Sequence, residues 1–229
     1  MDNTTDRVIN THPNSKRHTH TFIWLGCIAL FIFWLMSLFL WQTFKIQLIF
    51  LISATLVVIL IGILKCLEPR VSFFITPKMI IYCHRNGQWT LPWQDIIRFG
   101  EPKAYVQGEH IQLPYVGIKL NNLEHIASNI SPRLANKLIH EQQELLILAI
   151  ANKEIDFDGD DSVINFEPYT LNDIIYKGPI AAWLHRSEQL AKAYGYHLYL
   201  PESSLDRNLK HFLTLLKKCH HYTIVNGPY

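Results

Sequence analysis

A long apolar stretch near the N-terminus is the feature that most constrains this chain. From Phe22 to Trp41 there are 20 consecutive residues without a charged side chain, and Ile46 to Leu64 adds 19 more. A helix rises 1.5 Å per residue, so each run is about 30 Å long and matches the hydrocarbon thickness of a bilayer. Only Gln42–Lys45 separates the runs, so two helices here must be antiparallel neighbours. The sequence therefore predicts a transmembrane helical hairpin over residues 22–65, with spans at 22–41 and 46–64.

Neither a core hairpin of a soluble protein nor a signal peptide fits these runs as well. Core helices of soluble proteins are rarely so long and so free of charge. Two such runs in tandem are even less typical of a soluble core. A cleaved signal peptide has an apolar core of about 7–15 residues followed by a cleavage site with small residues, and the first run has a longer core and no such site. We therefore expect an uncleaved membrane anchor, integral to the lipid bilayer.

Basic residues near the ends of the runs predict the orientation of this anchor, because Lys and Arg favour the cytoplasmic side. The link between the runs contains one, Lys45. Three stand before the first run and four follow the second: Arg7, Lys16 and Arg17, then Lys65, Arg70, Lys78 and Arg85. We expect a multi-pass protein of the inner membrane with both termini in the cytoplasm.

The composition of the remaining residues limits the possible partners. Residues 1–21 read as a polar N-terminal tail, and residues 69–229 contain 16 Lys and Arg against 16 Asp and Glu, a formal charge of zero. A domain without a basic field is a poor candidate for nucleic-acid binding. The chain has no Cys-x-x-Cys pair, and free thiols fit a reducing compartment; its four cysteines are Cys27, Cys66, Cys83 and Cys219.

Two patterns divide the rest of the chain near Ser131, and together they predict an α+β fold. Residues 69–130 are β-rich, with Asn86-Gly87 as a hairpin turn and strands at Val71–Thr76, Met79–His84, Gln88–Leu91, Ile96–Phe99 and within Ile111–Leu120. We expect Trp89 and Trp93 to be strand residues that pack in the core. Residues 131–229 predict a short strand at His197–Leu200 and three helices: one from Pro132 to about Lys153, one between Gly178 and Gly195, and one after Ser203 or Ser204 with Leu205, Leu209, Phe212, Leu213 and Leu216 on its apolar side.

An acidic segment is the sharpest local motif. Counted from Asp156, oxygen-bearing side chains fall at the EF-hand positions 1, 3, 5, 7 and 12, which are Asp156, Asp158, Asp160, Ser162 and Glu167. The glycine that an EF-hand loop needs at position 6 is replaced by Asp161, and Pro168 follows directly. The motif is therefore closer to a solvated acidic turn before a strand at Val163–Phe166 than to a calcium site.

Two other groups of metal-ligating residues lack a complete set of ligands. His140-Glu141 begins like a zinc-protease motif, but Glu144 stands where the second histidine belongs, so we interpret this segment as the polar face of a helix. Cys219, His220 and His221 have no partner cluster with matching spacing, and we interpret them as the frayed end of a helix. We predict no catalytic residue, resident metal or cofactor.

The β-rich part resembles bacterial pleckstrin-homology-like domains. The stretch from Phe74 to Tyr82, the turn Asn86-Gly87 and the run Pro92-Trp93-Gln94-Asp95-Ile96 carry this resemblance, which implies an antiparallel, partly pleckstrin-homology-like sheet tethered behind a transmembrane hairpin. Taken whole, the chain resembles an uncharacterised family of two-pass inner-membrane proteins from gammaproteobacteria, a domain of unknown function. The apolar hairpin, the same Pro92–Ile96 run, and the stretch Tyr194–Pro201 leading into Leu205-Asp206-Arg207 carry this second resemblance, which implies a location and no activity.

These observations favour a non-enzymatic interaction or regulatory module, held at the membrane, that binds a protein partner or anionic lipid headgroups. Lys210, Lys217 and Lys218 make the C-terminal helix the most basic element, although an amphipathic core helix with a solvated outer face accounts for them better. The alternative is an envelope-associated enzyme with a site assembled from dispersed His, Asp and Glu residues.

Overall fold

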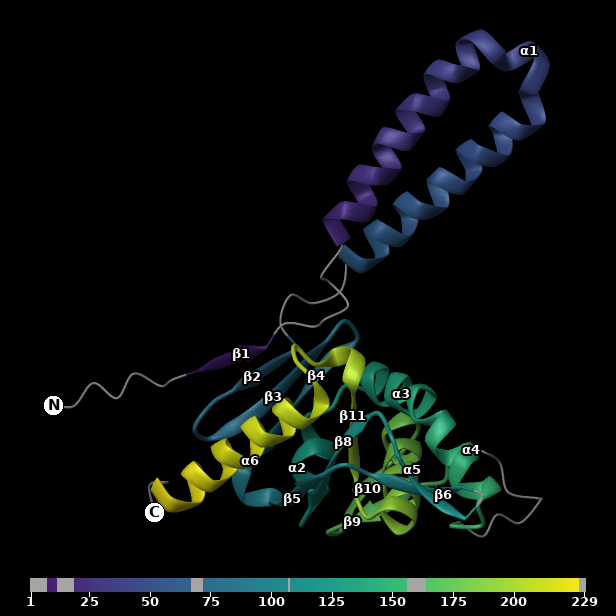
Figure 1. Cartoon of the computed structure of the whole chain (residues 1–229). Coiled ribbons are helices and arrows are strands. Elements are labelled where there is room, and N and C mark those ends of the chain that lie inside the picture. Colours follow the sequence, from purple (N-terminus) through teal and green to yellow (C-terminus); the bar gives the residue numbers. More distant parts are fainter. Residues whose placement is uncertain (1–7, 12–18, 67–71, 107, 156–163, 227–229) are drawn as a thin grey trace, which may run out of the picture. The chain divides into compact units, whose positions relative to one another are not determined.

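The computed structural model describes residues 8–11, 19–66, 72–106, 108–155 and 164–226. The chain divides into two compact units (Figure 1): residues 13–70 form one, and residues 1–12 together with 71–229 form the other. The fold is α+β, with a long apolar helix near the N-terminus and antiparallel sheets, as the sequence predicts.

The first unit contains helix α1 (Thr19–Cys66), which is interrupted at one residue. Phe44 has φ −126° and ψ 36°, outside the helical region, and it lies in the predicted link Gln42–Lys45. The ribbon reverses direction near this residue (Figure 1). Gly26 and Ile59, from the two sides of the interruption, approach closely, since a Cβ atom on Gly26 would lie 2.5 Å from Ile59 Cγ1. Among the described residues, one helix, Ile23–Leu64, is long and apolar enough to cross a membrane.

The second unit contains a four-stranded antiparallel sheet of order β1-β2-β3-β4. Its strands are β1 (Ile9–Thr11), β2 (Phe73–Ile75), β3 (Met79–His84) and β4 (Gly87–Pro92). Strand β1 falls in the segment that we expected to be a polar tail, and it pairs with β2 so that Thr11 stands opposite Phe73. The backbone N–H of Ser72 donates a hydrogen bond to the Thr11 carbonyl oxygen at 2.9 Å. Residues on the two sides of α1 thus belong to one sheet.

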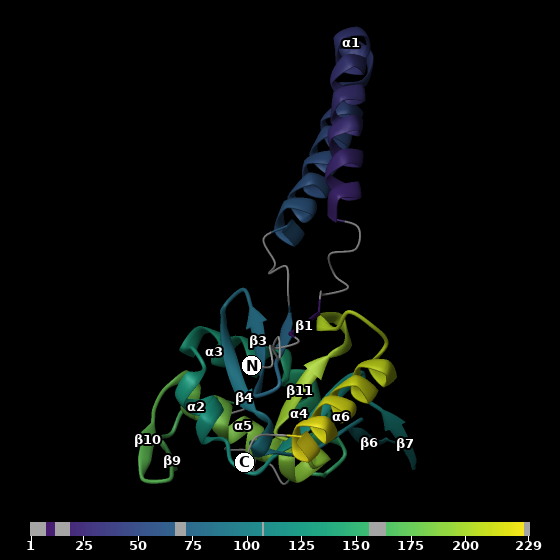
Figure 2. The same cartoon turned by 90° about the vertical axis from the view of Figure 1, so that its left-hand side faces the viewer.

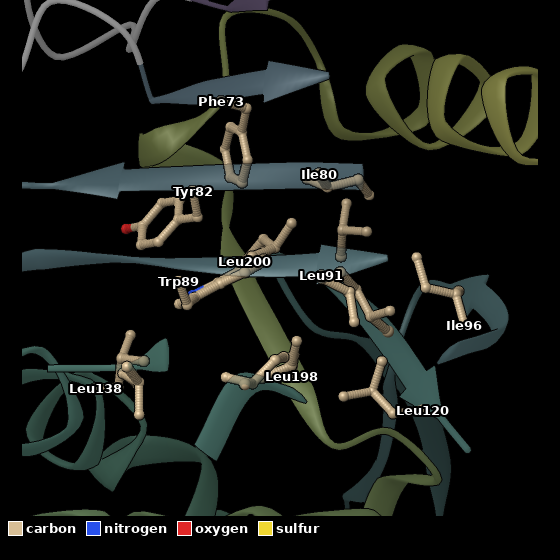
Figure 3. Close-up of a cluster of buried hydrophobic side chains, with 14 of the residues drawn as sticks. Phe73, Ile80, Tyr82, Trp89, Leu91, Ile96, Leu120, Leu138, Leu198 and Leu200 are labelled. Atoms are coloured by element: carbon tan, nitrogen blue, oxygen red, sulfur yellow. The ribbon is translucent and has the colours of Figure 1, made fainter. Parts of the chain in front are cut away.

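One face of this sheet forms the main core, because alternate residues point the same way. Figure 3 shows these side chains together with Leu138 of a helix and with residues of the second sheet. The buried residues of this face are Phe73, Ile75, Ile80, Tyr82, Trp89 and Leu91. The predicted strand Met79–His84 and the turn before Gly87 are confirmed.

A second sheet of three antiparallel strands has the order β11-β8-β5. Its strands are β5 (Ile96–Gly100), β8 (Tyr115–Leu120) and β11 (Leu198–Pro201). Trp93 lies in a 3-10 turn, Trp93–Asp95, rather than in a strand. Both tryptophans are buried as expected, Trp89 at 1% and Trp93 at 3% exposure, and the Trp93 indole N–H donates to the Thr76 carbonyl oxygen at 2.8 Å.

Two short ribbons do not follow from the sequence pattern: β6 (Lys103–Val106) with β7 (Glu109–Gln112), and β9 (Tyr169–Leu171) with β10 (Ile174–Tyr176). All four residues of β7 are exposed, and its sequence shows no alternation of apolar and polar residues that would predict a strand. Asn172 and Asp173, between β9 and β10, have positive φ and form the tight turn. Residues 164–166, in the strand predicted at Val163–Phe166, are not in a strand.

The predicted apolar faces of the helices match the structure better than the predicted helix bounds do. They are α2 (Glu124–Asn129), α3 (Pro132–Glu141), α4 (Gln143–Ala151), α5 (Pro179–Tyr194) and α6 (Leu209–Asn226). The predicted helix 132–153 is divided at Gln142, which has φ −90° and ψ 3°. The last helix begins at Leu209, because Glu202–Ser204 forms a 3-10 turn instead. Gly195, with φ 80°, ends α5 as predicted.

The stretch Tyr194–Pro201 joins α5 to the second sheet. The Tyr196 ring lies against Gly100 and Gly117, which stand opposite each other on β5 and β8, and a Cβ atom on Gly117 would lie 2.5 Å from Tyr196 Cγ. Arg98 covers the ring, with its guanidinium carbon 5.1 Å from the ring centroid. His197 Nδ1 accepts a hydrogen bond from the Leu120 N–H at 3.1 Å. Tyr196 and His197 therefore have structural roles in the second sheet.

Candidate interaction surface

Helix α6 carries exposed lysines on its outer side and packs into the core with its inner side. Leu209, Phe212, Leu213 and Leu216 recur with helical spacing and are all buried. The Phe212 ring packs on Phe73 of β2 with 5.4 Å between centroids. The helix also packs against β5 and β8 of the second sheet, and Figure 2 shows it on the side of β11. This packing determines which residues of α6 face outward.

His220 belongs to the inner side of α6. Its ring packs against Trp93 and Phe99, with centroid distances of 6.0 and 5.7 Å. Burial lowers the pKa of His220, which favours the neutral ring, and hydrogen bonds to the backbone of Ile96 and Trp93 act in the opposite direction. Burial also raises the pKa of the half-buried Cys219 thiol.

The interpretation of Cys219, His220 and His221 as a frayed end is wrong in one respect, because α6 continues to Asn226. His221 is exposed, whereas His220 is partly buried on the inner side. Within residues 8–11, 19–66, 72–106, 108–155 and 164–226, no three His, Cys, Asp or Glu residues are placed to hold a metal ion.

The outer side of α6 carries three exposed lysines together with Thr214, His221 and Tyr222, and we call these six residues the basic face: Lys210, Thr214, Lys217, Lys218, His221 and Tyr222. These residues follow one another at intervals that a 3.6-residue turn places on one side of a helix, and all are exposed. The sequence of α6 from Leu209 to Asn226 has no Asp or Glu. The nearest acidic residue in the sequence, Asp206, is paired with Arg207 through hydrogen bonds of 2.7 and 2.9 Å.

The acidic segment considered for calcium is described only at its end. Asp156, Asp158, Asp160 and Ser162 lie outside the described residues. Glu167 is described, and its backbone N–H donates to Asn165 Oδ1 at 2.8 Å. Its carbonyl oxygen lies 3.2 Å from His185 Nε2. The predicted acidic turn and the less favoured calcium alternative therefore both lie mainly outside the described residues.

The segment that begins like a zinc-protease motif spans the junction of α3 and α4. Glu141 forms an ion pair with Lys137 at 3.3 Å, the spacing of neighbours on a helix surface. His140 and Glu144 are exposed, as expected for a polar face, whereas Gln142 is 2% exposed. The buried Gln142 marks the point where α3 ends and α4 begins.

A polar cluster that the sequence did not reveal joins β9 to α5. The Tyr169 hydroxyl donates a short hydrogen bond to Glu188, and the His185 ring packs edge-on against Tyr169 with 5.0 Å between centroids. Burial, this hydrogen bond and the negative charge of Glu188 raise the pKa of Tyr169, so the phenol keeps its proton and acts as a donor. The cluster fastens the β9–β10 ribbon to α5. Tyr169 is 19 positions from Glu188 in the sequence, and no local pattern connects them.

Comparison with known proteins gives one match. A family model described as "Protein of unknown function (DUF2982)" matches residues 73–222, from the first residue of β2 into the last part of α6. No curated protein and no solved structure matches the chain.

Proposed function

This chain belongs to the DUF2982 family, whose members are described as proteins of unknown function, and we propose that it is a two-pass protein of the inner membrane that holds a cytoplasmic binding module at the bilayer. The proposal has three parts: the number of membrane crossings, their orientation, and a role in binding rather than catalysis.

The pairing of β1 with β2 carries the proposal. Thr11 precedes the apolar segment and Phe73 follows it, yet the two stand opposite each other in one sheet. A folded sheet cannot have strands on both sides of a bilayer, because the hydrocarbon core does not accept open strand edges. A membrane-crossing segment between β1 and β2 must therefore leave and re-enter on the same side, which requires an even number of crossings.

The surface of α1 supports its location in lipid. Large apolar side chains are exposed along the whole of this helix; Phe39 is 87% and Ile46 is 80% exposed. Water does not favour so much contiguous apolar surface, whereas lipid does. Three hydroxyls within the segment are satisfied locally: Ser37, Ser53 and Thr55 donate at 2.7–2.8 Å to carbonyl oxygens three or four residues earlier.

The interruption at Phe44 supports two spans. It divides α1 into parts of 25 and 22 residues on either side of Phe44 within Thr19–Cys66, and about 20 residues are enough to cross a bilayer. The single charged residue of the segment between Ile23 and Leu64, Lys45, is next to Phe44. A turn at the far surface of the bilayer accommodates this charge, while the more numerous basic residues outside the segment favour the cytoplasm.

The pleckstrin-homology-like resemblance stays a prediction. A meander of β2, β3 and β4 with a turn at Asn86-Gly87, a second antiparallel sheet and a helix packed beside them support it. The order β11-β8-β5 departs from a simple meander, because α2 to α5 intervene between β8 and β11.

The role in binding rests on the basic face of α6, a charged and exposed surface on a helix whose other side is fixed in the core. The enzymatic alternative has candidate groups in Tyr169, Glu188 and His185, whose polar contacts hold β9 on α5. It has another in the pair of His125 and Asp95, with 3.6 Å between Nδ1 and Oδ2. We therefore propose a module that recognises a surface or a partner.

Reporter fusions test the topology directly. A fluorescent protein and alkaline phosphatase are fused in turn after Tyr229, and alkaline phosphatase is also inserted next to Lys45. We expect fluorescence without phosphatase activity at Tyr229 and phosphatase activity at Lys45. Phosphatase activity at Tyr229 would place the β-sheet unit in the periplasm, and inactive phosphatase at Lys45 would exclude the second crossing.

A further inference from the structure

We propose that the basic face of α6 binds the headgroups of anionic phospholipids in the same bilayer that anchors the chain. This inference deepens the proposed function and rests on it, because α1 must first place the chain in the membrane. It assigns a ligand class and a site: phosphate-bearing lipid headgroups on Lys210, Lys217, Lys218 and their neighbours on the outer side of α6.

The inner contacts of α6 keep this face pointing outward. Phe212 is buried against Phe73, and His220 packs against Trp93 and Phe99. Near the end of the helix, the Thr223 hydroxyl donates to the Cys219 carbonyl oxygen at 2.9 Å and lies 3.5 Å from the Pro77 carbonyl oxygen. The ring contacts of Phe212 and His220 hold the inner side of α6, so its lysines face outward.

The charges of the face match an anionic surface. Three lysines lie on it with no acidic residue in α6, and Asp206 is already paired with Arg207. Residues 69–229 as a whole have a formal charge of zero, so the positive charge of this face is a local excess. A local basic stripe of this kind is attracted to anionic lipids over a distance of about one Debye length.

The apolar residues beside the lysines distinguish a membrane from other anionic ligands. Tyr222, Ile224 and Val225 are 64%, 65% and 61% exposed at the end of the helix. Nucleic acids stack their bases on aromatic rings and make little use of aliphatic groups such as Ile224 and Val225. An interfacial helix uses both kinds, combining cations for the phosphates with aromatic and aliphatic groups for the headgroup–acyl boundary.

The covalent connection to α1 keeps the face within reach of the bilayer. Six residues separate Cys66, the last residue of α1, from Phe73, the residue that packs on Phe212. Seven peptide steps extend no more than about 25 Å. A contact that is weak for a free protein becomes effective when a tether this short holds its two sides together.

Lysine acylation in nanodiscs tests the inference on the full chain. The chain is placed in discs of phosphatidylcholine alone or of phosphatidylcholine rich in phosphatidylglycerol, and the acylation rate of each lysine is measured by mass spectrometry. We expect Lys210, Lys217 and Lys218 to react several-fold more slowly in the anionic discs, and high salt to abolish the difference. Lys103 and Lys192, which are exposed outside α6, should react equally in both.

A pair of variants makes the test independent of folding. In K217Q/K218Q the anionic protection of Lys210 should be largely lost, whereas the matched variant K103Q/K192Q should retain it. Equal acylation of the α6 lysines in both discs overturns the inference while the anchoring stands. Inorganic phosphate that protects them in neutral discs reassigns the face to a free anion and also overturns it. A chain that does not enter the discs overturns the proposed function, and this inference with it.

Discussion

Thr11 and Phe73 are 62 positions apart in the sequence and stand directly opposite each other on neighbouring antiparallel strands. Between them lies the whole apolar helix α1. The three-residue strand β1 is short, and its pairing with β2 gives the sheet its fourth strand. This pairing links the segment before α1 to the domain after it, and it can be tested chemically.

A cysteine pair on the outer face of the sheet should form a disulfide. Asn10 and Phe74 are register partners on β1 and β2, and cross-strand neighbours have Cβ atoms about 4.5–5.5 Å apart. In a chain whose four native cysteines are replaced by serine, N10C/F74C should therefore cross-link under mild oxidation. Faster migration in a non-reducing gel reports the cross-link.

The matched control is N10C/I81C. Ile81 is the partner of Phe74 on β3, so it lies one strand farther from Asn10. Two strand spacings amount to about 10 Å, beyond the reach of a disulfide. Efficient cross-linking of this control, or none in N10C/F74C, would contradict the pairing of β1 with β2.

Gly117 should be intolerant of a side chain because of Tyr196. A Cβ atom at this position would lie 2.5 Å from Tyr196 Cγ, so G117A should lower the free energy of unfolding by about 1–3 kcal/mol, a typical cost of overpacking. Thermal or urea unfolding of the full chain in detergent measures the effect. In a Y196A background the same substitution should cost little, and an undiminished cost there would show that the strain has another origin.

The Ser131 hydroxyl should stabilise the start of α3 and its contact with the β3–β4 turn. It accepts a hydrogen bond from the Leu134 N–H at 3.2 Å and donates one to the Asn86 carbonyl oxygen at 2.9 Å. Loss of an N-cap costs about 1–2 kcal/mol, so S131A should lower the unfolding midpoint measurably. S128A removes an exposed hydroxyl whose bonds stay within α2, and we expect a change below about 0.5 kcal/mol. Equal losses in the two variants would contradict the role of Ser131 as a cap.

Acid should destabilise the fold partly through His220. Burial lowers the pKa of His220 in the folded state, so the unfolded chain binds the proton more readily. The stabilisation is therefore complete above the unfolded pKa of about 6.5 and is lost as pH falls below it. Unfolding curves recorded over this range should show a smaller pH dependence for H220F than for the native chain.

The control for this effect is H211Q, because His211 is exposed on the outer side of α6. Its pH dependence should match that of the native chain. His197, whose pKa burial also lowers, remains in both variants, so H220F should reduce the acid sensitivity and not remove it. A pH dependence that is unchanged in H220F would assign the sensitivity to other groups.

The hydrophobic pattern of the sequence made much of this fold predictable. Strand Met79–His84 and helix α5 have strong alternation or clear end signals, Asn86-Gly87 and Gly195, and the structure has them where the sequence places them. The long apolar helix was equally clear. Such elements are predictable because about half of their residues must be apolar to enter the core.

The remaining features depend on contacts between distant residues. Strand β1 has no alternation of its own and exists because the edge of β2 is available. The division of one helix into α3 and α4 at Gln142 has no Gly or Pro to announce it. The stripe of lysines on α6 was visible in the sequence, but its exposure followed only from the packing of Phe212 and His220 on the opposite side.

The order of synthesis gives the β1–β2 pair a further meaning. The ribosome releases β1 first and its partner Phe73 only 62 residues later. During that interval β1 has no neighbour, and a nascent chain that stalls within α1 cannot finish the sheet. Even after β2, β3 and β4 have formed, β2 keeps an open edge until β1 returns to it. Completion of this edge therefore requires that the whole apolar segment has been made and has turned back.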